Sequence, residues 1–386
     1  MVHGLGRAMG IVSAVGVLLV LAGCPAAGEE QPPSDGIDFR KTDDFWGGNF
    51  GAFAADACVL KLGDNEYRMY YTGLDMPSPE EPEGWSSAIC LALSENGREF
   101  INPTSSLDMP AASDERPFAV LAACDEPQSW EQKIETCFVV PTDDGYYLYY
   151  GGYRRGGAPV VDDGAPIDTM GAELGLAVSS GTSSGLAFER YGSTARDHIV
   201  LERTVESPDE DAIFSPSIVR ADGTFYMIYT GHRYSHDATV DQGVVLMGAT
   251  STDGVKWTKH EASPVMVPAS HRAPEDPAHD YAWMEWGVAE AHLIHGPDGR
   301  FYLFFQGMAE DAGHTIGVAR GDHPFGPWEI YPEPILRPTS GTPDEDGVIA
   351  PHVLFDGDTV RLYYNALHGD SWLIGYAECR WPFWPE

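Results

Sequence analysis

The sequence predicts an all-β protein built from repeated units of about four antiparallel strands. It contains 43 Gly and 29 Pro among 386 residues, 11% of its residues are aromatic, and one tyrosine-rich segment recurs five times. Frequent Gly and Pro residues between short aromatic segments are typical of strands joined by turns. Hydrophobic residues make up 43% of the chain, which is enough for a large core and excludes a disordered protein.

The recurring segment is an aromatic strand that follows an Asp/Gly turn. It occupies residues 67–73, 146–152, 225–231, 301–307 and 360–365, and its second central aromatic residue recurs at intervals of 79, 79, 76 and 59 residues. Turns such as Asp222-Gly223 supply the positive φ angles that hairpins need. Segments this rich in aromatic residues suit strands buried on both faces, so we expect these residues to serve packing.

Each unit contains further strands around the aromatic one. An apolar strand precedes the turn, a third strand ends on a small residue such as Ala92 or Ala249, and an aromatic residue such as Trp257 marks a weaker fourth strand. Five such units around an axis predict a five-bladed β-propeller. A solenoid is the competing architecture, but units of nearly eighty residues are too long for it. The last unit is short, so residues near 37–39 are expected to complete its outer edge.

The N-terminus has the pattern of an export signal. Residues 8–22 are almost wholly apolar, a length that fits a signal peptide better than a spanning helix. The following Gly23-Cys24 resembles the lipobox of bacterial lipoproteins, in which the cysteine is lipidated. We therefore expect a signal peptide over 1–23, a lipid-anchored Cys24 with a flexible tether over 24–36, and one propeller domain over 37–386. An ordinary signal peptide with an incidental cysteine is the alternative.

The destination and the redox state follow from neighbouring features. Pro25 is not an aspartate, so the lipoprotein resemblance implies the outer membrane of the cell envelope, facing the periplasm, rather than inner-membrane retention. Apart from Cys24, five cysteines remain, an odd number for an exported protein. Cys58 and Cys137 occupy similar places in neighbouring units and form either a disulfide or, as we favour, part of the packing.

The charge excludes several partners. Asp and Glu outnumber Lys and Arg by 59 to 23, which gives a net charge of −36. A polyanion requires clustered basic residues, and none is visible, so nucleic acid is excluded as a partner. Phosphate-binding loops, nucleophile elbows and HExxH zinc motifs are also missing from the sequence, which disfavours nucleotide, serine-hydrolase and zincin chemistry.

The start of each innermost strand carries the candidate chemistry. When the units are aligned on their aromatic strands, the same inner position is occupied by Asp56, Glu135, Ser215, Glu290 and Ala350. Two residues further along, the corresponding set is Cys58, Cys137, Ser217, His292 and His352. Strand alternation places both sets on one side, facing the axis. Three carboxylates and two histidines are therefore expected to converge on one cavity.

These repeats resemble the five-bladed glycoside hydrolases: the arabinanases, β-xylosidases, invertases, levansucrases and mannoside phosphorylases of families 43, 32, 68, 117 and 130. The resemblance covers residues 45–381 and implies carboxyl groups on either side of a glycosidic bond. By position, Asp56 would be base or nucleophile and Glu135 a stabilising acid. Ser215 stands where the family has its third acid, so Glu290 is the substitute candidate, with His292 or His352 as other possible acids.

Other residues are expected at the rim of the funnel. Loops leaving the aromatic strands carry Arg154, Arg155, His232 and Arg233, and Trp286 precedes the fourth inner strand. These side chains, with Ser215, His292 and His352, are candidates for substrate binding. Acids just upstream of the inner strands, as in 208–211 and 343–346, are expected either to be solvated or to cap turns, or else to form a rim that binds sugar hydroxyls or structural calcium. No other cofactor is expected.

Two functions remain open at this level. The first is a lipid-anchored enzyme, hydrolase or phosphorylase, that acts on a carbohydrate through Asp56, Glu135 and Glu290. The second is a non-catalytic surface propeller that binds glycan or protein, with the axial acids solvated or holding a cation. The strong negative charge favours a neutral glycan, unless Arg154, Arg155 and Arg233 form a local positive area.

Overall fold

The computed structural model describes most of the predicted domain and none of the predicted signal peptide. The described residues are 36–47, 53–74, 87–103, 118–124, 129–154, 158–162, 165–169, 171–180, 184–194, 196–233, 243–310, 312–369 and 371–385. The candidate residues Cys24 and Arg155 lie outside these ranges. Within them the fold is all-β, with helical structure limited to short 3-10 turns at Ala269–His271, Pro277–Asp280 and Ala282–Met284. None of the described helical segments is long and apolar enough to cross a membrane.

The strands can be divided into five antiparallel groups that follow the repeats. Single parallel pairs, Val244 with Gly287 and His314 with Gly347, link the last three groups into one 12-stranded sheet. The first is β2 (Ala54–Gly63), β3 (Glu66–Leu74), β4 (Ser87–Ser94) and β5 (Ala119–Ala122). The second is β6 (Lys133–Thr142), β7 (Gly145–Tyr153) and β10 (Glu173–Ser180), edged by β11 (Glu189–Arg190) and β12 (Ile199–Leu201). The third is β13 (Ala212–Ala221), β14 (Thr224–His232), β15 (Val244–Ser251) and β16 (Thr258–Lys259).

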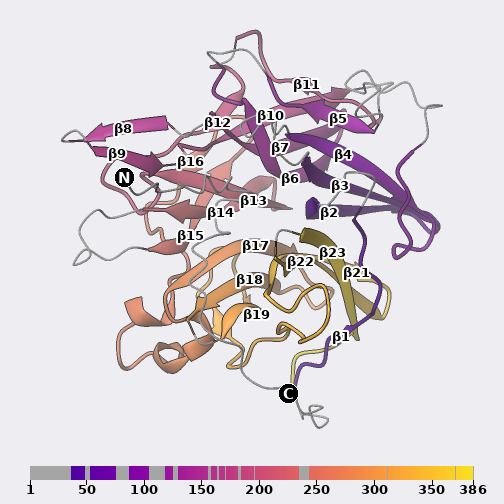
Figure 1. The fold of residues 1–386 in the computed structure, drawn as a ribbon, viewed down its shortest axis with the longest axis vertical. Helices are drawn as coiled ribbons and strands as arrows, with labels where there is room; N and C mark the ends of the chain where they lie inside the picture. Colours follow the sequence, from indigo (N-terminus) through magenta and orange to yellow (C-terminus); the bar gives the residue numbers. More distant parts are fainter. Residues whose placement is uncertain are drawn as a thin grey trace, which may run out of the picture.

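The fourth and fifth groups complete the series. The fourth is β17 (Gly287–His295), β18 (Phe301–Ala309), β19 (Gly313–Gly321) and β20 (Glu329–Ile330). The fifth is β21 (Gly347–Asp356), β22 (Thr359–His368), β23 (Ser371–Arg380) and the N-terminal β1 (Arg40–Lys41). A separate ribbon pairs β8 (Ala158–Asp162) with β9 (Ala165–Thr169). Figure 1 shows the groups following one another around a common centre as the colour runs from indigo to yellow.

The N-terminal strand β1 completes the outer edge of the last group, close to residues 37–39, which the short last repeat predicts for this place. Residues Arg40 and Lys41 of β1 pair with Glu378 and Ala377 of β23. Lys41 also forms an ion pair of 2.6 Å with the buried Asp344. The beginning and end of the described chain are thus held in one sheet.

Apolar packing lies between neighbouring groups. Five large clusters of buried residues join the first group to the second, the second to the third, the third to the fourth, the fourth to the fifth and the fifth to the first. The second central aromatic residue of each repeat is fully buried: Tyr71, Tyr150, Tyr229, Phe305 and Tyr364. The expected packing role of these aromatics is confirmed. Cys58 and Cys137 are also buried and are not joined in a disulfide, which confirms the packing interpretation.

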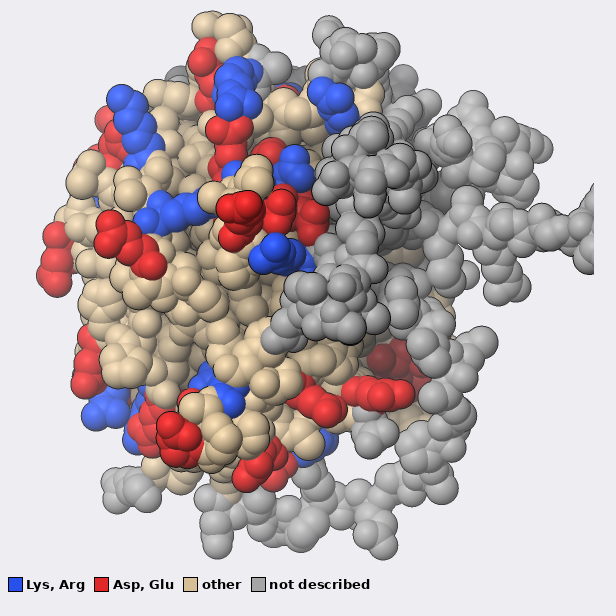
Figure 2. Space-filling model, turned by 90° about the vertical axis from the view of Figure 1, so that its left-hand side faces the viewer, with Lys and Arg blue, Asp and Glu red and all other residues tan. Residues whose placement is uncertain are grey.

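Turns and surface charge agree with the composition. Asp222 and Gly223 have φ angles of 49° and 78°, the pair of positive values that a type I′ hairpin turn requires. Figure 2 shows acidic and basic residues interspersed over the described part of one face, where no broad basic area forms. That distribution gives a nucleic acid no basic surface to bind on this face.

Candidate functional site

A left-handed bulge interrupts the first strand of every group at the same place. The residues with positive φ are Asp56 (55°), Thr136 (53°), Ser215 (50°), Glu290 (44°) and Ala350 (48°). In each strand the pairing register shifts across this residue and the next one. Non-glycine residues rarely adopt this conformation, and strained backbone of this kind concentrates at functional sites. Its fivefold repetition turns five side chains toward one place.

The bulge corrects the sequence alignment in the second group by one residue. Thr136, not Glu135, is the equivalent of Asp56 and Glu290, since Glu135 pairs with Gly151 before the register shift. Phe138 accordingly takes the position that the alignment gave to Cys137. The aromatic strands alone could not reveal this difference, because an inner strand with a bulge has no constant offset from its neighbour.

The five bulges enclose an axial cavity. Its lining comprises Asp56, Thr136, Cys137, Phe138, Ser215, Pro216, Glu290, Ala291, His292, Ala350, Pro351 and His352. The predicted convergence on one cavity is therefore found for Asp56, Ser215, Glu290 and both histidines. The cavity volume is about 40 Å³, room for roughly three water molecules and too little for a sugar ring.

Asp56 is held by a set of neutral hydrogen-bond donors. Its carboxylate accepts from Asn365 Nδ2 at 2.9 Å, from Thr72 Oγ1 at 2.8 Å and from the Thr136 backbone N–H at 3.2 Å. Its own backbone N–H donates to Asn365 Oδ1 at 2.8 Å. Burial raises the pKa of Asp56, and the bonds from Asn365, Thr72 and Thr136 oppose that rise.

Glu290 and Ser215 enter the cavity from the fourth and third groups. The Glu290 backbone N–H donates to Thr230 Oγ1 at 2.8 Å, and its side chain is almost fully buried. The Ser215 backbone N–H donates to Thr136 Oγ1 at 3.2 Å. Among the described residues, the buried Ser215 Oγ has no hydrogen-bond partner.

Glu135 lies next to the cavity but does not line it. It is 1% exposed, and Tyr153 donates its hydroxyl to Glu135 Oε2 at 3.1 Å. Burial, and then the neighbouring Glu135 carboxylate, raise the pKa of Tyr153 well above its usual value. This position suits an indirect electrostatic role rather than contact with a substrate.

Two stacked histidines form part of the cavity lining. The rings of His292 and His352 lie 4.1 Å apart at an angle of 19°, with Phe138 beside both. His352 Nε2 bonds to the Val59 carbonyl at 3.0 Å, and the Val353 N–H donates to His292 Nδ1 at 2.7 Å. Burial lowers the pKa of His352 to about 4 and that of His292 well below its usual value. Both rings are therefore neutral near pH 7 and bonded to backbone.

The described candidates for the rim differ in their exposure and their partners. Arg154 is exposed, Arg233 pairs with Glu210 at 3.4 Å, and His232 is 1% exposed with a pKa lowered by burial to about 4. Trp286 is 43% exposed. It directly precedes β17, so only three residues of chain separate it from Glu290. Of these residues, Trp286 has the exposed aromatic surface that sugar stacking requires.

In three groups one acid upstream of the inner strand is buried, where a solvated acid or a ligand-binding rim was expected. The expected capping of turns is found at Asp344, which accepts from the Thr339 N–H at 3.1 Å. Asp209 and Asp344 are fully buried and Glu131 is 1% exposed. Each accepts a hydroxyl from the central tyrosine of its own repeat at 2.6–2.9 Å, and each pairs with a cation of an outer strand: Arg190, Lys259 or Lys41. We call these three sets the tyrosine–acid–cation triads. They tie the inner and outer edges of a strand group together.

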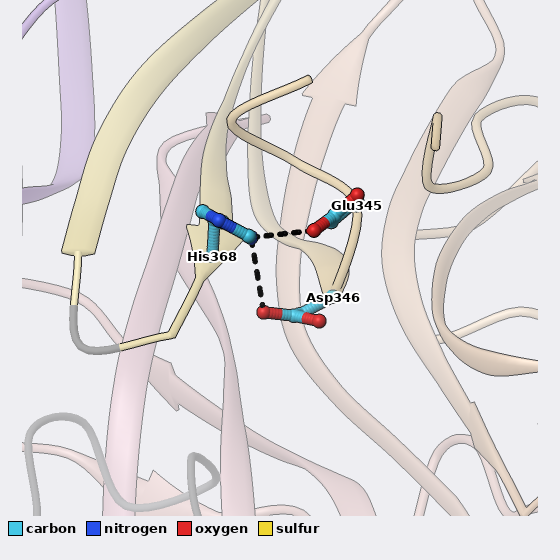
Figure 3. Close-up of side chains that lie close together, drawn as sticks. All are labelled: Glu345, Asp346 and His368. Carbon is cyan, nitrogen blue, oxygen red and sulfur yellow. Dashed lines mark ion pairs between the residues drawn. The ribbon is translucent and has the colours of Figure 1, made fainter. Parts of the chain in front are cut away.

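A more exposed acid pair remains beside the fifth group. Figure 3 shows His368, at the end of β22, facing Glu345 and Asp346 on the loop before β21. His368 Nδ1 lies 3.0 Å from Glu345 Oε1 and 3.4 Å from Asp346 Oδ2. In the third group, Arg233 occupies the equivalent place and pairs with Glu210. The repeat therefore places a basic side chain opposite the loop acid in both groups.

Sequence reasoning missed the residues that hold the bulges. The position after each central aromatic residue is occupied by Thr72, Gly151, Thr230, Gln306 and Asn365. Three of these side chains accept the backbone N–H of a bulge residue on the adjacent inner strand. A polar residue recurring in an aromatic, buried strand was the available signal. Strand alternation explains why a polar residue follows the central aromatic one, since the two side chains point to opposite faces of the sheet.

The fold is similar to that of glycoside hydrolases of the propeller type. Residues 196–288 match the family described as "Glycosyl hydrolases family 32 N-terminal domain". Among solved structures, a putative glycosidase from Bacteroides thetaiotaomicron has a TM-score of 0.60 at 15% identity, over 88% of this chain and 96% of that one. A thermostable family-43 glycoside hydrolase has a TM-score of 0.55 at 17% identity, over 86% of this chain and 91% of that one.

Curated relatives give the same indication over a shorter stretch. An arabinoxylan arabinofuranohydrolase of Paenibacillus polymyxa is 34% identical over 122 residues, which are 30% of this chain and 18% of that protein. One from Bacillus subtilis is 30% identical over 150 residues, which are 36% of this chain and 28% of that protein. The matches span less than a third of either relative. The chain therefore resembles propeller glycoside hydrolases, as its repeats predict.

Proposed function

We propose that this protein is a glycoside hydrolase-like enzyme that acts on a neutral glycan at its axial cavity. One observation carries the proposal. Asp56 and Glu290 come from different strand groups, each lies in the left-handed bulge of its own inner strand, and both line one cavity. Two carboxyl groups are the usual machinery for cleaving or phosphorolysing a glycosidic bond. The likeness to propeller glycosidases supports it.

The proposed scaffold is a closed five-bladed propeller, each blade being one of the five strand groups. The innermost strands contact one another in a cycle that returns from β21 to β2. The apolar clusters follow the same cycle, including the one between the fifth and first groups. Closure of this kind leaves one axial site whose residues come from every blade.

The proposed roles follow from position. Asp56 acts as base or nucleophile, because three donors orient its carboxylate at the cavity. Glu290 is the proton donor, and Glu135 stabilises charge from behind Tyr153. Because the cavity admits water but no sugar ring, the sugar binds above it, with its ring against Trp286 and a hydroxyl at Ser215 Oγ. The neutral histidines support the floor of the site.

A neutral substrate agrees with the local charges. Arg233 is paired with Glu210 rather than free to hold an acidic sugar. The relatives named above act on arabinoxylan, and another structure with this fold, a β-1,2-mannobiose phosphorylase from Listeria innocua, has a TM-score of 0.57. We therefore propose a neutral pentose- or hexose-containing glycan.

An activity screen tests the proposal. Aryl-glycosides and oligosaccharides of arabinose, xylose and mannose are incubated with the protein, with and without inorganic phosphate to separate hydrolysis from phosphorolysis. We expect turnover by the wild type and a loss of about a thousandfold or more in Asp56→Asn and Glu290→Gln. Asp346→Asn, outside the cavity, is the matched control. Turnover that persists unchanged in Asp56→Asn would rule out this site.

The alternative function is non-catalytic glycan binding. It is favoured by one observation, namely that the third bulge presents the hydroxyl of Ser215 where the family has an acid. Calorimetry with the same oligosaccharides separates the two. Binding without turnover, retained in Asp56→Asn, would establish the binding function in place of catalysis.

We also propose that the protein is exported and anchored through Cys24 in the outer membrane. In the sequence the proposed tether over 24–36 precedes β1, which begins at Arg40 and lies at the outer edge of the fifth group. Radiolabelled fatty acid should be incorporated by the wild type and not by Cys24→Ser, which should leave the membrane fraction. Equal labelling of both proteins would exclude lipidation at this residue.

A further inference from the structure

Polar side chains on the second strand of a group hold the bulges across group boundaries. Thr72 Oγ1 accepts from the Thr136 N–H at 3.0 Å, and Thr230 Oγ1 accepts from the Glu290 N–H at 2.8 Å. Asn365 Oδ1 accepts from the Asp56 N–H. In each case the acceptor belongs to one group and the bulge to the next. The contact therefore fixes the αL backbone and the relative position of two groups together.

At Asp56 this arrangement also reaches the carboxylate. Asn365 bonds to Asp56 twice, accepting from its backbone N–H and donating to Oδ1. Thr72 donates to Oδ2 and accepts from the Thr136 N–H, which itself approaches Oδ2. Thr72 and Asn365 are both fully buried. Both carboxylate oxygens of Asp56 are thus bonded by side chains of the first and fifth groups.

We propose that Asn365 and Thr72 are positioning residues that clamp the Asp56 carboxylate and its strained backbone in the orientation that the site uses. The inference rests on the proposed function only for the importance of that orientation to turnover. The clamp itself is a property of the side chains. It also gives the polar residue after the central tyrosine a specific task in the first and fifth groups.

The energetic reason is the burial of Asp56. Desolvation favours the neutral acid, and hydrogen bonds from Asn365, Thr72 and Thr136 favour the carboxylate. Removing one donor therefore makes Asp56 harder to ionise. The other titratable groups that line the cavity are Cys137, Glu290, His292 and His352, and they are unchanged in the variants below.

Thr72→Val and Asn365→Ala remove the donors, and a direct titration of Asp56 tests the clamp without substrate. The protein is labelled with 13C at the aspartate carboxyl carbon, and the Asp56 signal is identified by its loss in Asp56→Asn. We expect the titration midpoint of Asp56 to rise by about one pH unit, a tenfold change in its ionisation equilibrium, in each variant. Thr72→Ser, which keeps the hydroxyl, should restore the wild-type midpoint.

Thr230→Val is the matched control. Its hydroxyl occupies the same repeat position in the third group, but it accepts the Glu290 N–H and does not contact Asp56. Its Asp56 midpoint should equal that of the wild type. If Thr72→Val does not fold, Asn365→Ala carries the test alone. Midpoints for Thr72→Val and Asn365→Ala that match the wild type would overturn the clamp.

Kinetics then separate this inference from the proposed function. Where the wild type turns over a glycan, kcat of Asn365→Ala should fall about tenfold with little change in KM, and the acidic limb of its pH profile should move upward with the Asp56 midpoint. A shifted midpoint in a protein without turnover would retain the clamp and reject catalysis. An unshifted midpoint in an active protein would do the reverse.

Discussion

Two buried aspartates, Asp56 and Asp344, show how the same side chain is accommodated in two ways. Asp344 is fully buried and is bonded to the Lys41 ammonium at 2.6 Å and to the Tyr364 hydroxyl at 2.8 Å. Asp56 is 7% exposed, and its hydrogen-bond donors within the described residues are all neutral. The first charge is neutralised by a cation, and the second is only oriented.

The two aspartates are held by consecutive residues of one strand. Tyr364 of β22 points to Asp344 and the next residue, Asn365, points to Asp56, as alternation along a strand requires. Neutralised acids contribute to stability. An acid buried among neutral donors at a cavity remains able to exchange a proton, which is how acid–base groups are usually prepared. The comparison therefore separates Asp344 from Asp56, the proposed catalytic residue, by their partners rather than by their burial.

Removal of a triad acid should have the largest effect on stability. In Asp344→Ala, the Lys41 ammonium and the Tyr364 hydroxyl lose their partner in a mostly buried place. We expect the free energy of unfolding to fall by about 3 kcal/mol. Urea unfolding measures it, with Asp346→Ala as control, since that exposed acid should cost less than about 1 kcal/mol. Equal losses in both variants would remove the distinction between the two kinds of acid.

Acid should destabilise the protein through its axial histidines. His352 has a pKa lowered to about 4 because burial disfavours its charged form. The unfolded chain then binds the proton more readily, so the stability is fully present above pH 6.5 and is lost as pH falls toward 4. This difference in proton binding lowers the free energy of unfolding by roughly 3 kcal/mol once the pH is below 4. Unfolding at pH 7 and pH 5 should show a smaller loss in His352→Gln than in the wild type, and identical losses would contradict the neutral ring.

The stability of a triad should depend on the hydroxyl of its central tyrosine. Tyr229→Phe removes the donor to Asp209 and should cost about 1 kcal/mol. The fourth group has Phe305 at this position, packed against Trp283 with ring centroids 5.5 Å apart. The reverse change, Phe305→Tyr, should also destabilise by about 1 kcal/mol or more, because its hydroxyl would be buried without an acid. A gain in thermal stability from Phe305→Tyr would contradict this account.

The repeats predict the fold well, and the reason is geometric. Aromatic segments predict buried strands, Asp/Gly pairs predict hairpin turns, and the short final unit predicts that the N-terminal segment completes the last group. The structure agrees with all three predictions. The site is only partly predictable from the same rules. The expected cavity lining is found for Asp56, Ser215, Glu290, His292 and His352. In the second group, however, the bulge residue is Thr136, one position after the Glu135 that the alignment predicts. A bulge has no signature in residues that are not glycine, so its register is visible only in the backbone.

The missed triads have a different cause. Glu131, Asp209 and Asp344 lie in acidic or polar sequence before each inner strand, where solvated loops are the usual outcome. Their burial depends on cations far away in the chain, Lys41 being 303 residues from Asp344. No local pattern contains that pairing. The central tyrosine was only part of the signal. It marks a triad in the second, third and fifth groups, but Tyr71 of the first group accepts from the Asn102 amide at 2.8 Å instead, and the fourth group has Phe305 packed against Trp283.

The smallest expected effect on stability is also the most discriminating one. Asp56→Asn keeps the side-chain shape, and asparagine tolerates the left-handed backbone that Asp56 adopts at φ 55°. It removes the cost of burying a charge but places an amide where Thr72 and the Thr136 N–H donate, so the two changes largely offset each other. We expect unfolding free energy at pH 7 within about 1 kcal/mol of the wild type, together with the loss of turnover. A loss as large as that of Asp344→Ala would mean that Asp56 is a structural acid after all, because only a group on which the fold depends is that costly to neutralise.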